Sequence, residues 1–491
     1  MVLYRVAALL AVFFGLACSS VSAQGMHDVK GMPDNHHGAL AEQVISALST
    51  GQGEAFATLL STNGTPTFAQ SRNAVDDRTF ARKFGFRSQG LTIWGRRVFG
   101  AEGGELNVLA TENLTGRWRQ ITFVFAEDKI DSFGIAYAMP PEHDRPGPLT
   151  KAQAQKKIAA YLDAAESAGL FSGVVLIAQH EDILLQSAHG LASARYAVPN
   201  TLATRFNLAS VNKMFTASLI LRMVEAGNLS LETPVSDVLD DSWIAPEIGA
   251  KITIRHLLTH MSGLGSYFTE DFMASSPLLY RNIEDYKAVV RAQIPAFEPG
   301  TSWLYSNAGY ILLGAVLETL NGETYDAQLA DTIFNPLGMN ASGCFAKDAP
   351  IANVATNLYI DFSEDAPAWR EETALGTVRG ASAGGCYATA GDLSRFANAL
   401  LKNEIFSAEM RDAAWTDYTP EGSREDYGLG FFLWNGPFGQ YVGHSGGFIG
   451  PNAELKIDPE TGWVIIALSN SSEGLRETMG LIEGTLSRIK N

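Results

Sequence analysis

The pattern of apolar and polar positions along the chain predicts a small domain at its start. Between residues 39 and 60, apolar side chains recur every three or four positions, which indicates a helical segment with a break at 51–53. Strand-like runs follow at 91–99, 105–110, 118–125 and 129–138, with Glu127-Asp128 as the turn between the last two. Helices followed by an antiparallel meander predict an α+β domain over residues 39–139.

A second and larger domain is predicted after a proline-rich linker at residues 140–149, which contains four prolines. The linker precedes a predicted helix at 151–168 and a strand hairpin formed by 173–179 and 183–188. The chain ends with another hairpin, formed by 453–457 and 463–469. Residues 150–491 therefore mix helices with strand hairpins and form the second predicted unit.

The first residues have the character of a signal peptide, residues 1–23. Arg5 precedes a short apolar stretch, and small residues stand before Gln24, where we expect cleavage. An uncleaved anchor and a lipoprotein modified at Cys18 are the alternatives. We expect residues 24–38 to be a solvated linker, although three histidines leave a metal-binding tract as a second interpretation. The mature protein is predicted to be periplasmic or secreted, without a stable membrane-inserted segment.

The acidic charge of the chain limits the partners that it can bind, and its cysteines predict a disulfide. The net charge of −17 and the pI near 5.0, without a Lys/Arg-rich run, argue against nucleic acid and anionic membrane surfaces as partners. After cleavage only Cys344 and Cys386 remain. In an oxidising compartment we expect them to form a disulfide with a structural role.

Ser210-Val211-Asn212-Lys213 is the first candidate for chemistry, because it opens an apolar helical stretch. A serine at a helix start lies near unpaired backbone N–H groups, and a lysine three positions later lies on the same face. Such an amine can take the serine proton and make the hydroxyl a nucleophile. The alternative is an N-cap serine followed by a surface lysine, and the same spacing recurs at Ser487 and Lys490.

Two later motifs add to this site. Tyr305-Ser306-Asn307 precedes a helical run, where a tyrosine can carry a proton and an asparagine amide can orient a substrate. Gly443-His444-Ser445-Gly446-Gly447 matches the G-x-S-x-G elbow of α/β-hydrolases, with Ser445 as nucleophile. That fold requires a catalytic histidine after the serine, and no histidine follows His444 in this sequence. We therefore favour a strand along which glycines allow close approach of a substrate.

Taken together and in this order, the three motifs resemble the signature set of β-lactamases and penicillin-binding proteins. Stretches 253–264 and 383–393 look similar to that family as well. The resemblance covers about 149–491 and is strongest to the class C-like branch, which holds β-lactamases, family VIII esterases and D-amino-acid-specific peptidases. It implies an antiparallel sheet with flanking helices and an all-helical subdomain. The preceding α+β domain resembles nuclear-transport-factor-2-type domains.

The resemblance implies roles for individual residues. Ser210 would be the acyl-forming nucleophile, with Lys213 and Tyr305 as proton-transfer partners, and either of the two could be the base. Asn307 would hold Lys213 and the substrate. The N–H groups of Ser210 and Gly447 would form the oxyanion hole beside Gly446.

At the position of His444 relatives carry a lysine that holds a substrate carboxylate. A largely neutral histidine there favours hydrolysis of esters or D-amino-acid peptides over efficient β-lactamase activity.

The predicted function is an exported serine hydrolase acting on small-molecule esters, amides or peptides through a Ser210 acyl-enzyme. A D,D-carboxypeptidase or transpeptidase of the cell wall is one alternative, and a non-catalytic sensor module is the other. We expect no cofactor and no metal, since His256 and His260 have zinc-ligand spacing but no glutamate between them. The oligomeric state is left open.

Overall fold

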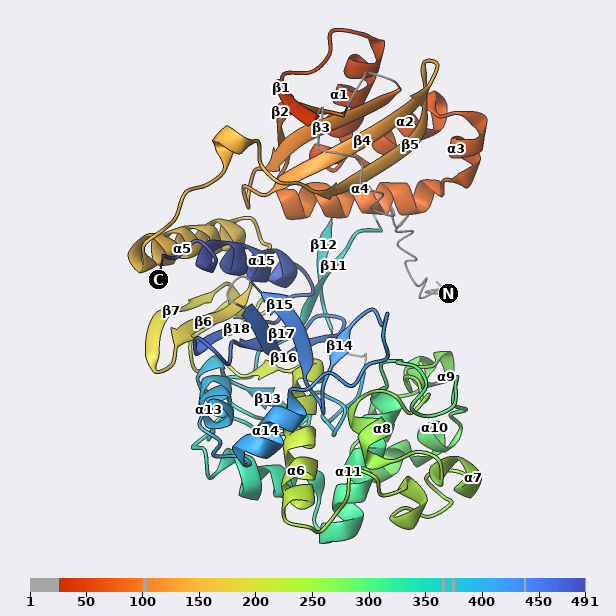
Figure 1. Cartoon of the computed structure of the whole chain (residues 1–491), viewed down its shortest axis with the longest axis vertical. Coiled ribbons are helices and arrows are strands. Elements are labelled where there is room, and N and C mark those ends of the chain that lie inside the picture. Colours follow the sequence, from red (N-terminus) through yellow and green to blue (C-terminus); the bar gives the residue numbers. More distant parts are fainter. Residues whose placement is uncertain (1–25, 100–103, 364–366, 373–375, 437–438, 491) are drawn as a thin grey trace.

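A computed structural model of the chain describes residues 26–99, 104–363, 367–372, 376–436 and 439–490. The predicted signal peptide lies outside these residues. Figure 1 shows an N-terminal unit of helices and one sheet above a larger unit with a second sheet.

The N-terminal unit packs helices against one face of a five-stranded antiparallel sheet in the order β1-β2-β3-β4-β5. Alternate residues of β3 and β4, such as Val108, Ile121 and Phe123, face the helices and form its core with Val44 and Leu48. The predicted helices and strands are present, and their likeness to a nuclear-transport-factor-2-type domain stays a prediction. The elements are β1 (Met26–Lys30), α1 (His36–Ser49), α2 (Gly53–Asn63), α3 (Pro66–Ser71), α4 (Ala74–Ser88), β2 (Leu91–Phe99), β3 (Glu105–Glu112), β4 (Trp118–Ala126) and β5 (Lys129–Tyr137).

The prediction that residues 24–38 form a solvated linker is wrong over most of this segment. Met26–Lys30 pairs with β2 as an edge strand, and α1 begins at His36 with the Asn35 side chain as its N-cap. An ion pair of 2.8 Å between Asp28 and Arg97 joins the two strands. Five residues of mixed polarity carry little strand signal, because an edge strand exposes one side and is stabilised by its neighbour.

The second unit is built on a seven-stranded antiparallel sheet in the order β14-β15-β16-β17-β18-β6-β7. The neighbouring inner strands β18 and β6 are apolar on both faces, because helices cover both sides. Val175 and Ile177 face α5 and α15, while Val174 and Leu176 face the core that contains α6 and α13. The elements are α5 (Lys151–Ser167), β6 (Gly173–Gln179), β7 (Asp182–His189), α6 (Lys213–Glu225), α13 (Ala390–Leu401), β14 (Asp426–Tyr427), β15 (Phe432–Gly436), β16 (Gly439–Gly447), β17 (Asn452–Ile457), β18 (Trp463–Ser469) and α15 (Leu475–Leu486).

A helical region lies beside this sheet, at the lower right of Figure 1. Its longest helix is α11 (Asn307–Asn321), which is buried along most of its length and packs against α6. The antiparallel sheet with flanking helices and the all-helical part are therefore confirmed. The shorter helices are α7 (Pro246–Gly249), α8 (Ile254–Leu258), α9 (Glu270–Ala274), α10 (Lys287–Arg291) and α12 (Tyr325–Leu329).

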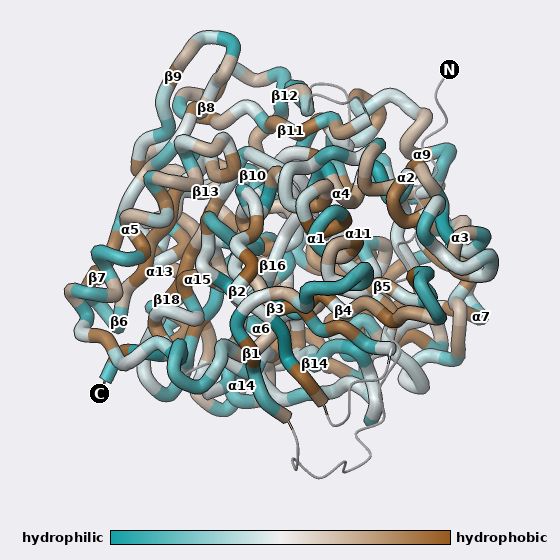
Figure 2. Tube along the Cα trace, turned by 90° about the horizontal axis from the view of Figure 1, so that it is seen from above, coloured by the Kyte–Doolittle hydropathy of each residue, from teal (hydrophilic) through white to brown (hydrophobic). Residues whose placement is uncertain are grey.

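The hydropathy of the residues along the chain agrees with this arrangement of buried and exposed elements. Hydrophilic segments colour much of the rim in Figure 2, including the end of the β6–β7 hairpin. In the parts of the chain that the structure describes, none of the helices has both the length and the apolar character needed to cross a bilayer.

Candidate active site

Ser210 lies in a tight turn rather than in the first turn of a long helix. Residues Ala209–Asn212 form a 3₁₀ turn that leads into α6. Ala209 has a φ of +44°, which a residue with a side chain adopts rarely, and its N–H donates to Asn207 Oδ1 at 2.8 Å. Its carbonyl accepts from Gly385 N–H at 3.2 Å. These contacts hold a partly exposed Ser210 at the edge of a cavity.

Lys213 is fully buried directly below the serine. Its Nζ lies 3.2 Å from Ser210 Oγ, 2.8 Å from Asn307 Oδ1 and 2.5 Å from the Ala383 carbonyl oxygen. Burial lowers the pKa of this amine well below its ordinary value, because a cation loses its hydration there. The site therefore favours a neutral amine next to the serine hydroxyl.

Tyr305 and Asn307 approach from the start of α11. Ser306 caps this helix by accepting from Gly309 N–H at 2.8 Å, so the residues on either side of it face the cavity. Enclosure of the Tyr305 phenol raises its pKa, and its hydrogen bond with Ser210 counteracts part of that rise. Asn307 donates through Nδ2 to Ser266 Oγ at 3.1 Å while its oxygen accepts from Lys213. Ser210, Lys213, Tyr305 and Asn307 are thus brought together as the sequence predicts.

Strand β16 passes next to the serine turn, and glycine is required there. Beyond Gly443 the strand has no partner in β15, and this edge runs along the serine turn. A Cβ at Gly446 would lie 2.4 Å from the Leu208 carbonyl oxygen and 2.7 Å from Ser210 N. Gly447 lines the cavity. Ser445 lies inside a strand rather than in a strand–turn–helix elbow, which removes the α/β-hydrolase interpretation.

The cavity above Ser210 has a volume of about 270 Å³. Its charged lining residues are Lys347 and Glu372, which form an ion pair of 3.0 Å. Aromatic side chains lie on another side, where the rings of Phe268 and Phe448 are 5.3 Å apart. Sequence reasoning missed these four residues. Lys347 and Glu372 lie far from the motifs along the chain, and Phe268 and Phe448 lie close to motif segments without belonging to a motif, so only the fold shows that all four line the cavity.

His444 does not take the predicted place beside the substrate. It is completely buried and is absent from the cavity lining. Its Nδ1 lies 2.5 Å from the Ser445 carbonyl oxygen and its Nε2 lies 3.0 Å from Tyr427 Oη. Burial, together with the nearby Lys213, lowers the pKa of His444 to about 3, so the ring is neutral at physiological pH. The expected contact with a substrate carboxylate is therefore corrected to a buried hydrogen-bonding position.

This burial gives a prediction about stability. Between about pH 6.5 and pH 4 the unfolded histidine takes up a proton that native His444 does not, so this residue makes the free energy of unfolding fall with decreasing pH. In His444→Gln we expect that slope, measured by urea denaturation, to be smaller by up to about 1.4 kcal/mol per pH unit. His143→Gln is the control, because His143 is exposed. Equal slopes in wild type and His444→Gln would contradict the assignment.

His256 and His260 do not form a zinc pair in this fold. Helix α8 ends at Leu258, and His260 has a φ of +61°, so the two rings do not share a helical face. His256 Nδ1 accepts from Thr253 N–H at 3.2 Å, and His260 Nδ1 accepts from Ser306 N–H at 3.0 Å. Within the described residues there is no group of three or more His, Cys, Asp or Glu side chains arranged to hold a metal ion.

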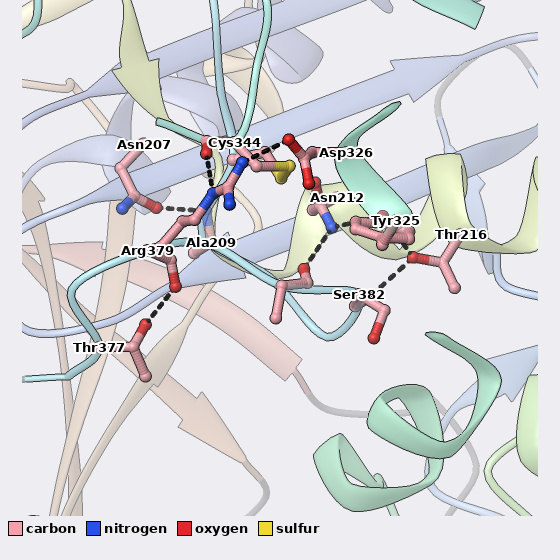
Figure 3. The surroundings of a disulfide bond; sticks show 12 residues. Asn207, Ala209, Asn212, Thr216, Tyr325, Asp326, Cys344, Thr377, Arg379 and Ser382 are labelled. Atoms are coloured by element: carbon pink, nitrogen blue, oxygen red, sulfur yellow. Dashed lines mark hydrogen bonds and ion pairs between the residues drawn. A yellow bond between two sulfur atoms is a disulfide. The ribbon is translucent and has the colours of Figure 1, made fainter. Parts of the chain in front are cut away.

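Cys344 and Cys386 form a disulfide next to the serine turn. The Cys386 carbonyl accepts from Leu208 N–H at 2.8 Å, just before the turn. Figure 3 shows that Arg379 hydrogen-bonds the Cys344 carbonyl and pairs with Asp326 in the same region. The bridge therefore fixes the segment on which the nucleophile turn rests.

Replacing both cysteines with alanine is expected to lower the free energy of unfolding by about 2–4 kcal/mol, because the open chain gains entropy in the unfolded state. The bridge closes a loop with a sequence separation of 42 residues, which lies in the range where this effect is large. Urea denaturation with and without a reductant measures it. The reductant should destabilise the wild type and leave the Cys344→Ala/Cys386→Ala variant unchanged, and equal sensitivity of both would contradict the prediction.

Comparison with known proteins agrees with the fold and the site. Residues 154–483 match the family described as Beta-lactamase. Penicillin-binding protein 4* of Bacillus subtilis is 31% identical over 325 residues, which cover 62% of this chain and 69% of that protein. Esterase EstB of Burkholderia gladioli is 34% identical over 186 residues, or 35% of this chain and 47% of that protein. The crystal structure of a penicillin-binding protein from Bacillus halodurans has a TM-score of 0.60 and 30% identity, covering 67% of this chain and 98% of that one.

The fold and these relatives define a serine hydrolase with a β-lactamase-like fold. The chain belongs to the β-lactamase family.

Proposed function

We propose that the chain is an exported hydrolase that cleaves esters or amides through an acyl-enzyme on Ser210. The observation that carries this proposal is the position of a fully buried Lys213 with its Nζ 3.2 Å from Ser210 Oγ. A serine hydroxyl becomes a strong nucleophile only when a neighbouring base takes its proton.

The surroundings of Lys213 support a neutral amine as that base. A neutral amine has two N–H groups and one lone pair. Asn307 Oδ1 and the Ala383 carbonyl oxygen can only accept, so they take the two N–H groups. The lone pair is then left for Ser210, which has a proton to give. Because the pKa of Tyr305 is raised, its phenol keeps its proton in the resting site, and it can pass that proton to the leaving group while it takes up from Lys213 the proton that came from Ser210.

The negative charge that forms on the substrate oxygen needs hydrogen-bond donors. The backbone N–H groups of Ser210 and Gly447 are the proposed donors, since both residues line the cavity and β16 passes against the serine turn. Donors of this kind typically contribute about 3–4 kcal/mol to stabilising the transition state.

The charges of the cavity favour a neutral acyl group. Lys347 is the cation in the lining, and Glu372 already pairs with it, so a substrate carboxylate would have to compete with Glu372. The aromatic side formed by Phe268 and Phe448 suits an apolar group. This combination, with esterase EstB among the relatives, supports esters and uncharged amides as substrates.

A cell-wall D,D-carboxypeptidase or transpeptidase is the second candidate. It is favoured by the relationship to penicillin-binding protein 4* of Bacillus subtilis. Analysis of muropeptide products would distinguish it from a small-molecule esterase.

Export is supported by two features. The first residues have the pattern of a signal peptide, and the Cys344–Cys386 disulfide suits an oxidising compartment. We propose a periplasmic or secreted location on that basis.

Covalent labelling tests the proposal. The protein is incubated with a fluorophosphonate probe and, separately, with a fluorescent penicillin, and the labelled residue is mapped by mass spectrometry. We expect the fluorophosphonate on Ser210, and Ser445→Ala should be labelled like the wild type. Label on Ser445, or no label on any serine, would overturn the proposal. Labelling of Ser210 by the penicillin as well would favour the cell-wall candidate.

A further inference from the structure

The N-terminal unit is in contact with a hairpin that belongs to neither main sheet. This hairpin consists of β11 (Leu358–Asp361) and β12 (Ala368–Glu371), which form a separate two-stranded sheet, and Leu358 at its base also bridges to Ser471 of the catalytic unit. In Figure 1 it extends from the catalytic unit toward α4. An isolated two-stranded hairpin is marginally stable in water, so its position depends on what it packs against.

Helix α4 provides that contact at the far end of the hairpin. Arg82 is buried and donates to the carbonyl oxygens of Phe362 and Ser363 at 3.0 and 3.1 Å. The ring of Phe86, one turn later on α4, packs edge-to-face on Phe362 with 5.7 Å between centroids. Lys83 Nζ lies 5.6 Å from the centre of the same Phe362 ring.

The same helix is fixed to the body of the catalytic unit. Arg87 pairs with the buried carboxylate of Glu473 at 2.5 Å, just before α15. Phe86 also packs against the apolar cluster beneath α5 and α15. Helix α4 is therefore a fixed support for the hairpin.

The other end of the hairpin forms a wall of the cavity. Asn357 precedes β11 and Glu372 follows β12, and both line the cavity above Ser210. Glu372 N–H donates to the Asn357 carbonyl oxygen at 2.9 Å, which closes the hairpin at this end. Glu372 also holds Lys347 in its ion pair.

We infer that the N-terminal unit sets the shape of the substrate cavity, with Arg82 and Phe86 as positioning residues for Asn357 and Glu372. Both strands run from the α4 contact to the cavity wall, so loosening the α4 end loosens the wall, although Leu358 keeps its backbone hydrogen bonds with Asn470 and Ser472. The inference rests on the proposed function, because it takes this cavity as the substrate site. The reacting groups Ser210 and Lys213 do not lie on the hairpin, so the chemical step should not depend on α4.

Steady-state kinetics with two esters test the inference. p-Nitrophenyl acetate has a small acyl group, whereas the p-nitrophenyl ester of N-acetylphenylalanine needs more of the cavity. For Arg82→Met and for Phe86→Ala we expect KM of the larger ester to rise about three- to tenfold. We expect kcat, and both constants for the acetate, to stay within about twofold. The matched control is Arg78→Met, because Arg78 is on the same helix but pairs with Glu54 inside the N-terminal unit.

A second measurement does not depend on activity. Hydrogen–deuterium exchange of peptides covering 357–363 and 368–372 should become faster in Arg82→Met and Phe86→Ala than in Arg78→Met. Phe362→Ala, which changes the contact from the catalytic side, should give the same result if a variant of α4 fails to fold. Unchanged exchange, or equal loss of activity on both esters, would overturn the inference. A wild type that neither hydrolyses these esters nor takes the fluorophosphonate label on Ser210 would refute the proposed function, while faster exchange would still support the mechanical contact.

Discussion

Ser210→Ala is expected to lower the rate of p-nitrophenyl acetate hydrolysis by more than about a thousandfold. Without the hydroxyl, no acyl-enzyme can form, and Lys213 has no proton to take. Hydrolysis is measured by the release of p-nitrophenolate, and the acyl-enzyme is detected by intact-mass measurement. The variant should show neither.

Two other serines are the controls for this prediction. Ser445 belongs to the competing G-x-S-x-G motif, and Ser487 is followed by a lysine at the same spacing as Ser210. Ser445 lies in β16, and Ser487 lies just after α15. Ser487→Ala should keep full activity, and Ser445→Ala should still form its acyl-enzyme on Ser210. Loss of the acyl-enzyme in Ser445→Ala with its retention in Ser210→Ala would reverse the assignment.

The reacting residues could be predicted because they lie close together in the sequence or belong to motifs that occur in a characteristic order. A serine and a lysine three positions apart on one helical turn meet without help from distant segments. The assignment of Tyr305, Asn307 and Gly447 depended on three motifs that occur together in this order. Each motif alone could equally be an ordinary helix cap or turn. The strand hairpins were readable because apolar residues gather in them between turn residues.

His444 shows where the prediction lacked a step that the sequence could have supplied. Side chains of a strand alternate between two faces, so His444 shares a face with Val442 and Ser445 has the other. Val442 belongs to the main core of the catalytic unit. Because it shares a face with a core residue, His444 is expected to be buried, whereas the motif position alone suggested a histidine that faces the substrate.

Other parts of the site could not be predicted from local pattern. Lys347 and Glu372 reach the cavity from segments that carry no motif, and their ion pair exists only in the fold. Helix α4 is rich in charged residues, so its contact with the hairpin has no clear apolar stripe in the sequence. Strand β1 was missed because an edge strand depends on its neighbour.

Lys213→Met is expected to lower kcat/KM for p-nitrophenyl acetate by about a hundred- to ten-thousandfold, the usual effect of losing a general base. Methionine keeps most of the volume of the buried side chain and removes the amine, so Ser210 stays in place without its base. The control is Lys251→Met, an exposed lysine paired with Glu298, which should keep full activity. Thermal unfolding checks that both variants fold.

The pH dependence of the wild type gives the second half of this prediction. Burial lowers the pKa of Lys213, so the neutral base is present above that pKa and lost as the pH falls through it. kcat/KM should therefore decrease toward acid pH, and the residual activity of Lys213→Met should lack this acid limb. Tyr305 has a raised pKa and keeps its proton over the same range, so it cannot produce the limb. An acid limb that persists unchanged in Lys213→Met would assign the base to another group.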